Sequence, residues 1–192
     1  AYTATLGPFV DAGVLGAAEV YVAGTIARAT GESDPDVTLA VALAARALRF
    51  GHVCILPADV AGLIVVDDAQ LTTTDMLPWP DPERWVARLA ASPAVRAPVD
   101  PAGDVTVPLV FDGTRLYLDR YWCFEERVAN DLLDRAAATG GIVDPAASLD
   151  AILAPLFGPD DPASPDRQRR AATLALTRRL TVIAGGPGTG KT

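Results

Sequence analysis

The chain has 192 residues, which is enough for one ordinary domain or for a small domain with part of another. Half of the residues are hydrophobic and 21% are charged, so the composition is that of a globular protein and excludes a disordered one. The net charge of −8 argues against a surface that coats nucleic acid, and no apolar run is long enough to cross a bilayer.

The first 51 residues predict helices. Residues 11–30 carry apolar side chains at helical spacing, although the glycines in this stretch weaken the prediction. The next helix is better marked, because Asp34 can cap its start and Pro35 suits its first position. Its apolar stripe begins at Val37, and Gly51 is expected to end it.

Prolines divide the middle of the chain. The short apolar runs at residues 53–56 and 63–66 fit either a strand or a buried helix, and both interpretations stay open. Asp81 and Pro82 predict the start of another short helix. Residues 93–104 are rich in proline and predict a loop.

A β-hairpin is expected next. Two apolar runs, residues 109–111 and 116–118, flank Asp112 and Gly113, and these two turn residues tolerate positive φ. The elements predicted after the hairpin are a helix over 124–138 ended by Gly140 and Gly141, a shorter helix over 148–157 and a linker over 158–165.

The pattern changes after the linker. Residues 166–179 predict a helix with one apolar face, and residues 180–184 predict a strand buried on both faces, as in a parallel sheet covered by helices. We expect the neighbouring strands to come from beyond residue 192. Without them, this segment should be frayed, paired with another chain, or packed on the helices around Leu132 and Leu174.

A glycine-rich segment follows at once. Residues 185–192 match G-x-x-x-x-G-K-[ST], the phosphate-binding loop pattern, in the strand-then-loop context that it requires. Glycines let backbone N–H groups surround the β-phosphate, Lys191 reaches the β- and γ-phosphates, and the Thr192 hydroxyl joins the Mg²⁺ shell. The residues expected to bind ATP and Mg²⁺ are Gly185, Gly186, Pro187, Gly188, Thr189, Gly190, Lys191 and Thr192.

Two side chains sharpen this prediction. Lys191 is the single lysine of the chain, and it stands where a compact ammonium differs most from a planar guanidinium, so it is the expected catalytic residue. Gln168 lies on the helix that leads to the strand, and its amide can both donate to and accept from adenine. Taken alone, Gln168 is more simply interpreted as an exposed helical glutamine.

Together these segments resemble the RecD family, the alpha subunits of exonuclease V (RecBCD). The phosphate-binding loop alone is shared with many ATPases, so the segments before it make the resemblance specific. The segments that carry the resemblance are residues 51–54, residues 115–118 with Arg120, Trp122 and Cys123, then Gln168, residues 175–179 and residues 185–192.

The resemblance implies a superfamily 1 DNA helicase that uses ATP to move 5′→3′ on single-stranded DNA. It implies a cytoplasmic complex with RecB and RecC, without a membrane, that acts in double-strand break repair and recombination, with the nuclease chemistry in RecB. We therefore expect a mainly α N-terminal module with a β-hairpin, followed by the start of an α/β RecA-like motor domain. The expected parts are a helical partner-docking domain over 1–106, the hairpin and connecting helices over 107–157, a linker over 158–165 and the start of the ATPase domain over 166–192. The sequence is expected to be a fragment that does not turn over ATP, because the later helicase motifs are missing. Since it does not begin with Met, the true start is expected to lie upstream.

Two other functions stay open. The phosphate-binding loop also fits another P-loop ATPase, such as an AAA-type remodelling enzyme. Alternatively, the chain is a non-catalytic docking module. The residues that follow Thr192 would discriminate between these hypotheses.

Structural roles are predicted for the remaining cysteine, histidine and glutamate candidates. His52, Cys54 and Cys123 lack the spacing of a metal site, and two distant cysteines fit a reducing cytosol better than a disulfide framework. Glu125 and Glu126 are adjacent on a predicted helix and so point to different faces, which argues against paired acid and base catalysis.

The module before residue 104 is expected to dock on a protein rather than on DNA, because acidic residues outnumber basic ones there. Side chains with the character of interface anchors are Phe9, Val10, Trp79 and Trp85. The tryptophans, Trp122 among them, are expected in a core or an interface rather than stacked on bases.

Overall fold

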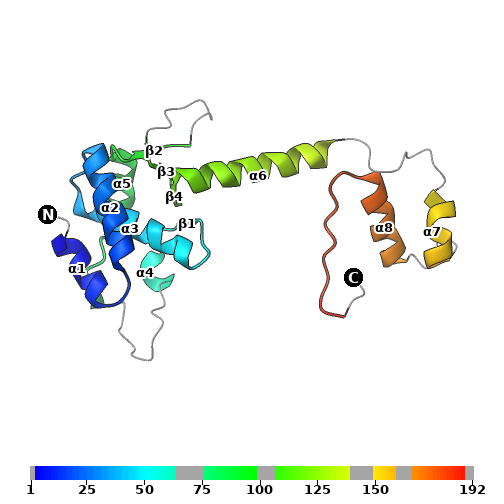
Figure 1. Cartoon of the computed structure of the whole chain (residues 1–192), viewed down its shortest axis with the longest axis horizontal. Coiled ribbons are helices and arrows are strands. Elements are labelled where there is room, and N and C mark those ends of the chain that lie inside the picture. The colour runs from blue at the N-terminus through cyan, green and yellow to red at the C-terminus, as the bar shows by residue number, and fades with distance from the viewer. Residues whose placement is uncertain (1–2, 64–75, 99–106, 139–148, 159–165, 189–192) are drawn as a thin grey trace. The chain divides into compact units, whose positions relative to one another are not determined.

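The computed structural model describes residues 3–63, 76–98, 107–138, 149–158 and 166–188 (Figure 1). The chain forms two compact units, Ala1–Glu125 and Glu126–Thr192. The elements of the first unit are α1 (Thr3–Asp11), α2 (Ala17–Thr30), α3 (Pro35–Arg49), β1 (Cys54–Ile55), α4 (Val60–Leu63), α5 (Pro82–Ala91), β2 (Val95–Arg96), β3 (Leu109–Phe111) and β4 (Leu116–Leu118). The remaining elements are α6 (Asp119–Ala137), which crosses the division, and α7 (Leu149–Phe157) and α8 (Arg167–Thr177) in the second unit.

Helix α3 is the centre of the first unit. It begins as its sequence predicts, because Asp34 Oδ1 accepts a hydrogen bond from the Asp36 amide at 2.8 Å and Pro35 occupies the first turn. Most of its residues are buried, and α1, α2, α5 and the sheet pack around it. Gly51 adopts a φ of 78° just beyond the end of the helix, a conformation that glycine tolerates best.

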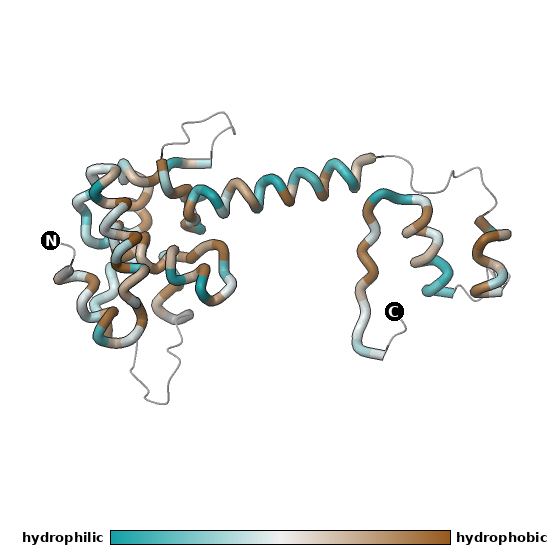
Figure 2. The backbone as a smooth tube through the Cα atoms, viewed as in Figure 1, coloured by the Kyte–Doolittle hydropathy of each residue, from teal (hydrophilic) through white to brown (hydrophobic). Residues whose placement is uncertain are grey.

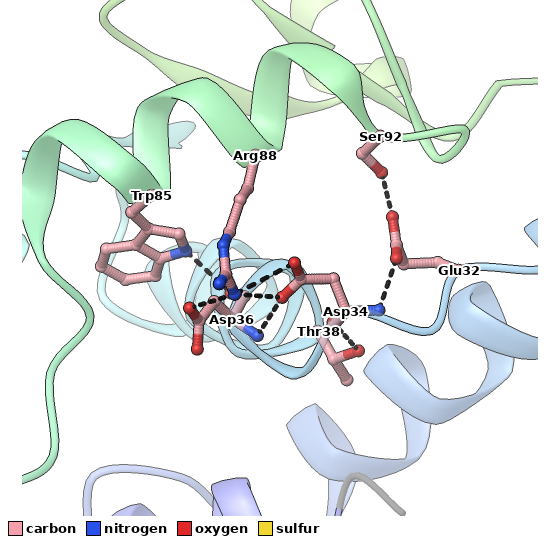
Figure 3. A network of polar contacts seen from close by, with 7 residues as sticks. All are labelled: Glu32, Asp34, Asp36, Thr38, Trp85, Arg88 and Ser92. Carbon is pink, nitrogen blue, oxygen red and sulfur yellow. Dashed lines mark hydrogen bonds and ion pairs between the residues drawn. The ribbon is translucent and has the colours of Figure 1, made fainter.

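Helix α5 lies across the start of α3 and is held there by a polar network (Figure 3). Arg88 Nη1 contacts Asp36 Oδ2 at 2.7 Å and Asp34 Oδ2 at 3.1 Å, so one guanidinium binds the capping residue and its neighbour. Just past the same end of α5, the Ser92 hydroxyl donates to the Glu32 carboxylate. The network thus joins two helices whose residues lie far apart in the sequence.

A four-stranded sheet with the order β1-β4-β3-β2 lies beside these helices. Strands β3 and β4 form the predicted antiparallel hairpin, and Asp112 Oδ1 accepts from the amides of Thr114 at 2.8 Å and Arg115 at 2.6 Å. Strand β1 resolves the open interpretation of residues 53–56 in favour of a strand. Strand β2 lies in the stretch predicted as a loop, so that part of the loop prediction is wrong.

The hairpin belongs to the same compact unit as the helices. Its outer neighbours, β1 and β2, both precede residue 106 in the chain. The boundary expected between residues 106 and 107 therefore falls inside the unit Ala1–Glu125. The assignment of residues 1–106 to partner docking stays a prediction.

Aromatic side chains fill the core of this unit. Phe9 is 0% exposed and packs edge-to-face on Trp79 with ring centroids 4.7 Å apart. Trp85 is 1% exposed, and its indole Nε1 donates to the Asp36 carbonyl at 2.7 Å. The expectation that Phe9 and Trp85 anchor a partner is therefore wrong, because the core of the unit uses their apolar area. Of the two places expected for the tryptophans, a core or an interface, Trp85 takes the core.

Helix α6 starts at Asp119, earlier than the predicted Phe124, and runs straight on from β4. Its first residue is fixed by tertiary contacts, since Arg96 Nη2 lies 2.6 Å from Asp119 Oδ1 and the Asp119 amide donates to the Pro108 carbonyl. Hydrophilic and hydrophobic residues alternate along the helix (Figure 2). None of its residues is buried over this described length, and its exposed apolar side chains are Phe124, Val128, Leu132 and Leu133.

In the second unit, both predicted helices form, as α7 and α8, and they pack against each other. Residues 180–184, predicted as a strand, adopt neither helix nor strand, and Val182 is 83% exposed. A strand requires hydrogen-bonded neighbours, and no described residue pairs with this segment. Among the described helices, none combines the length and apolar character needed to cross a membrane.

Candidate functional site: the approach to the glycine-rich segment

Helix α8 leads directly to the glycine-rich segment. Asp166 caps it, with its Oδ1 accepting from the Gln168 amide at 2.8 Å. At the other end, the Thr181 hydroxyl donates to the Leu174 carbonyl at 3.0 Å, which ties the chain beyond the helix back to its last turn. These two contacts fix both ends of the element that carries Gln168.

The glycine-rich segment is described as far as residue 188. Residues 185–188 are exposed, and Gly188 has a φ of 76°, in the left-handed region. A Cβ atom built at Gly188 meets nothing within 4 Å, so the backbone conformation and not the space demands glycine there. The predicted ligands Thr189, Gly190, Lys191 and Thr192 lie outside the described residues.

Gln168 is exposed near the start of α8. Successive helical residues are rotated by about 100°, so Gln168 and Arg169 present to adjacent faces of the helix. Its exposure fits either hypothesis made from the sequence, an adenine ligand or a solvated side chain.

Arg169 is the residue of this unit that sequence patterns missed. It is 6% exposed, and its Nη1 donates to the Gly158 carbonyl at 2.6 Å while its Nη2 forms an ion pair with Asp150. No sequence pattern predicts that Arg169 contacts Asp150, which lies 19 positions earlier on the other side of a proline-rich linker. Only the packing of α7 on α8 brings the pair together.

A groove of about 820 Å³ lies within the second unit, near the ends of α6 and α8. Three guanidinium groups and two carboxylates line it, and Arg135 Nε pairs with Asp131 Oδ2 at 2.9 Å. Arg178 and Arg179 line the groove directly before the segment that carries the glycines. The residues that line the groove are Asp131, Asp134, Arg135, Ala138, Ala175, Arg178, Arg179 and Thr181.

A second groove, of about 600 Å³, lies between α1 and α2 in the first unit. Two of its apolar side chains are well exposed, Val10 at 40% and Tyr21 at 71%. Val10 is thus an expected interface anchor whose side chain the structure leaves exposed. The residues that line it are Leu6, Gly7, Val10, Asp11, Ala17, Val20, Tyr21 and Arg28.

Cys54, Cys123 and His52, considered above as possible metal ligands, contact neighbouring residues of the fold. Cys54 pairs across strands with Tyr117, and burial raises the pKa of the Cys54 thiol, which keeps it protonated and weakly nucleophilic. Cys123 Sγ lies 3.8 Å from Asp119 Oδ2, and the His52 amide donates to the Ala47 carbonyl at the end of α3. Among the described residues, no three His, Cys, Asp or Glu side chains gather as a metal site would require.

The family match lies within the first unit, and the similarity to curated relatives covers nearly the whole chain. Residues 11–117 match the family model described as the RecBCD enzyme subunit RecD, N-terminal domain. The chain is 44% identical over 186 residues to the RecBCD enzyme subunit RecD of Mycobacterium tuberculosis, covering 96% of the chain and 28% of that relative. It is also 44% identical over 179 residues to the subunit of the same name from Mycolicibacterium smegmatis, covering 93% of the chain and 28% of that relative. The chain thus spans about 28% of the length of these curated relatives.

Proposed function

This chain belongs to the RecD N-terminal domain family, and from that membership we propose that it forms the front part of a helicase subunit. In this proposal the full-length protein is a cytoplasmic DNA helicase, an exonuclease V alpha subunit that moves 5′→3′ on single-stranded DNA by hydrolysing ATP. It works with RecB and RecC in double-strand break repair and recombination. The observation that carries the proposal is the family match over residues 11–117 followed in the same chain by a complete phosphate-binding loop sequence at residues 185–192.

The proposed ATP site begins at the end of α8, where a RecA-like motor domain starts. Residues 180–184 form its first strand once neighbouring strands are present, and the glycine-rich loop that follows surrounds the phosphates. Lys191 bridges the β- and γ-phosphates, and Thr192 holds Mg²⁺. Gln168 contacts the adenine. The left-handed φ of 76° at Gly188 supports the loop, because this backbone strongly favours glycine.

The experiment for this site is Lys191→Arg in the full-length protein. The substitution keeps the charge, but a planar guanidinium does not fit where a small ammonium bridges two phosphates, so steady-state ATP hydrolysis should be abolished. The matched control is Arg170→Lys, the reverse exchange at an exposed position of α8, which should keep the parental rate. Hydrolysis near the parental rate in the Lys191→Arg variant would contradict the ATP site.

The charge distribution supports docking of the first unit on a protein. Residues 1–106 hold 13 acidic and 6 basic side chains, a net charge of −7, whereas residues 107–192 hold 11 and 10, a net charge of −1. Such an acidic surface repels phosphates and fits a basic protein surface. We propose that the groove between α1 and α2, with Val10 and Tyr21 exposed at it, faces RecB or RecC.

A binding experiment on the assembled complex tests this surface. Val10→Ser and Tyr21→Ser should each weaken capture by RecB or RecC by roughly tenfold, the effect of losing an interface anchor. The matched control is Val128→Ser on α6, which removes an exposed valine from outside the groove. A first unit that binds single-stranded DNA tightly and with strong salt dependence, but neither RecB nor RecC, would contradict the proposal.

The family match also bears on the alternatives. An AAA-type remodelling enzyme would explain the phosphate-binding loop but not the match over residues 11–117, which favours the helicase hypothesis. A purely non-catalytic docking module predicts that Lys191→Arg has no effect on hydrolysis in the full-length protein, so the same experiment separates it from the main proposal.

A further inference from the structure

We propose that Arg169 is a positioning residue that sets the orientation of α8 and thereby the place where Gln168 meets the adenine. The proposal rests on the ATP site proposed above and adds the element that aligns it. Arg169 itself touches neither nucleotide nor metal in this proposal. Its partners are all on the protein.

The contacts of Arg169 span the whole of α7. Asp150 lies in the first turn of that helix and Gly158 directly follows its last residue, and the Arg169 guanidinium binds both. The Arg169 side chain is only 8% exposed, whereas that of Asp150 is 66% exposed. A planar guanidinium can hold a carbonyl and a carboxylate at the same time, and a lysine ammonium holds such a pair with far less directional control.

This clamp fixes the rotation of α8 about its own axis. Arg169 packs toward α7, so the adjacent Gln168 is held on a neighbouring, exposed face. Asp166 and Thr181 fix the two ends of α8, but neither contact reaches α7. A rotation of α8 would swing the Gln168 amide away from a bound base, and hydrogen bonds weaken steeply with misalignment.

The expected phenotype is a loss of base selection with little loss of chemistry. In the full-length protein, Arg169→Ala should raise the KM for ATP, and it should lower the ratio of kcat/KM for ATP to that for GTP by about fivefold, as for one impaired hydrogen bond. The value of kcat at saturating ATP should change little. Asp150→Asn, at an exposed position that tolerates substitution, should shift the same ratio in the same direction by a smaller factor. Arg170→Ala, which removes an exposed arginine next to the clamp, should shift neither parameter.

Restoring the pair provides the decisive comparison. Exchanging the two charges in the double variant Asp150→Arg, Arg169→Asp should recover part of the ATP preference that Arg169→Ala loses. An Arg169→Ala variant that unfolds at lower temperature but keeps the KM for ATP and the ATP-to-GTP ratio would overturn the proposal, because its role would then be structural only. If Lys191→Arg keeps full hydrolysis, the ATP site itself has failed. If Lys191→Arg is inactive while Arg169→Ala matches Arg170→Ala, only the positioning role has failed.

Discussion

Buried arginines in this protein are held by specific partners. Arg46 Nε donates to the Val14 carbonyl at 2.9 Å, and its guanidinium lies 4.2 Å from the centre of the Phe50 ring. Burial lowers the pKa of Arg46, which measures the cost of keeping this charge away from water. Arg169, buried in the second unit, is likewise held by specific partners, the Gly158 carbonyl and the Asp150 carboxylate. At both sites a planar, multidentate cation satisfies groups that a lysine would serve less well.

The buried side chain of Tyr117 makes the stability of the first unit depend on pH. It is 2% exposed, and burial, with a smaller contribution from Cys54, raises its pKa to about 12. Because the unfolded chain ionises at the ordinary value of about 10, Tyr117 stabilises the fold fully below that pH and loses the contribution as the pH rises towards 12.

We therefore expect Tyr117→Phe to reduce the fall in the free energy of unfolding between about pH 10 and pH 12. Urea unfolding of the first unit, followed across that range, measures it. Tyr21→Phe, at a tyrosine that is 71% exposed, is the control and should keep the parental pH profile. Equal alkaline losses in the parent and in Tyr117→Phe would show that another group, such as Cys54, dominates.

At the scale of elements, short strands depend on turns that hold them in place. Strands β3 and β4 each have three residues, and the turn between them places Gly113 at a φ of 94°. The Asp112 side chain accepts two amides of the same turn. This local chemistry compensates for the few backbone hydrogen bonds that such short strands provide.

Gly113→Ala should therefore destabilise the first unit by about 1–2 kcal/mol, because an alanine side chain is strained in the left-handed region. Gly7→Ala in α1 is the matched exchange, and it should be neutral or stabilising by up to about 1 kcal/mol, since its new Cβ atom meets nothing within 4 Å and alanine favours helix. Thermal and denaturant unfolding compare the two variants. Equal effects of both exchanges would show that the turn conformation is not maintained in solution.

On the scale of the whole molecule, the chain is organised as two units joined through α6. The first unit holds the buried aromatic core, the sheet and the anchored start of α6. The second unit holds α7 and α8 and has a small core, with Leu153 and Arg169 as its buried side chains among the described residues. The apolar segment at residues 182–183 stays exposed there.

A chain of residues 1–125 should therefore fold alone and unfold cooperatively, with a midpoint close to that of the same transition in the 192-residue chain. A chain of residues 126–192 should show little cooperative unfolding, since it buries too little apolar area to offset its conformational entropy. Calorimetry of the three chains makes the comparison. An unfolded 1–125 chain would mean that the second unit supplies part of the first unit's stability.

Features that depend on local chemistry could be predicted from the amino-acid pattern alone. Asp34 and Asp81 predicted helix starts because a cap satisfies backbone amides only a few residues away, and both caps form. Asp112 and Gly113 predicted the hairpin because both residue types tolerate positive φ. Gly113 adopts a φ of 94°, whereas Asp112 serves the turn by accepting an amide hydrogen bond. The phosphate-binding loop prediction is local too, and residues 185–192 carry its full pattern although their ligand geometry stays a prediction.

Features whose partners lie far away in the chain could not be predicted in this way, because folding brings those partners together. Strands β1 and β2 have two residues each and exist because β4 and β3 lie beside them. Phe9 and Trp85 have the composition of interface anchors, but packing against α3 and its neighbours made them core. Residues 180–184 have the pattern of a buried strand, but no described strand pairs with them, and a strand is completed by hydrogen bonds to another strand and not by its own sequence. Arg169 gained its role from Asp150 and Gly158, which the fold and not the spacing brings within reach.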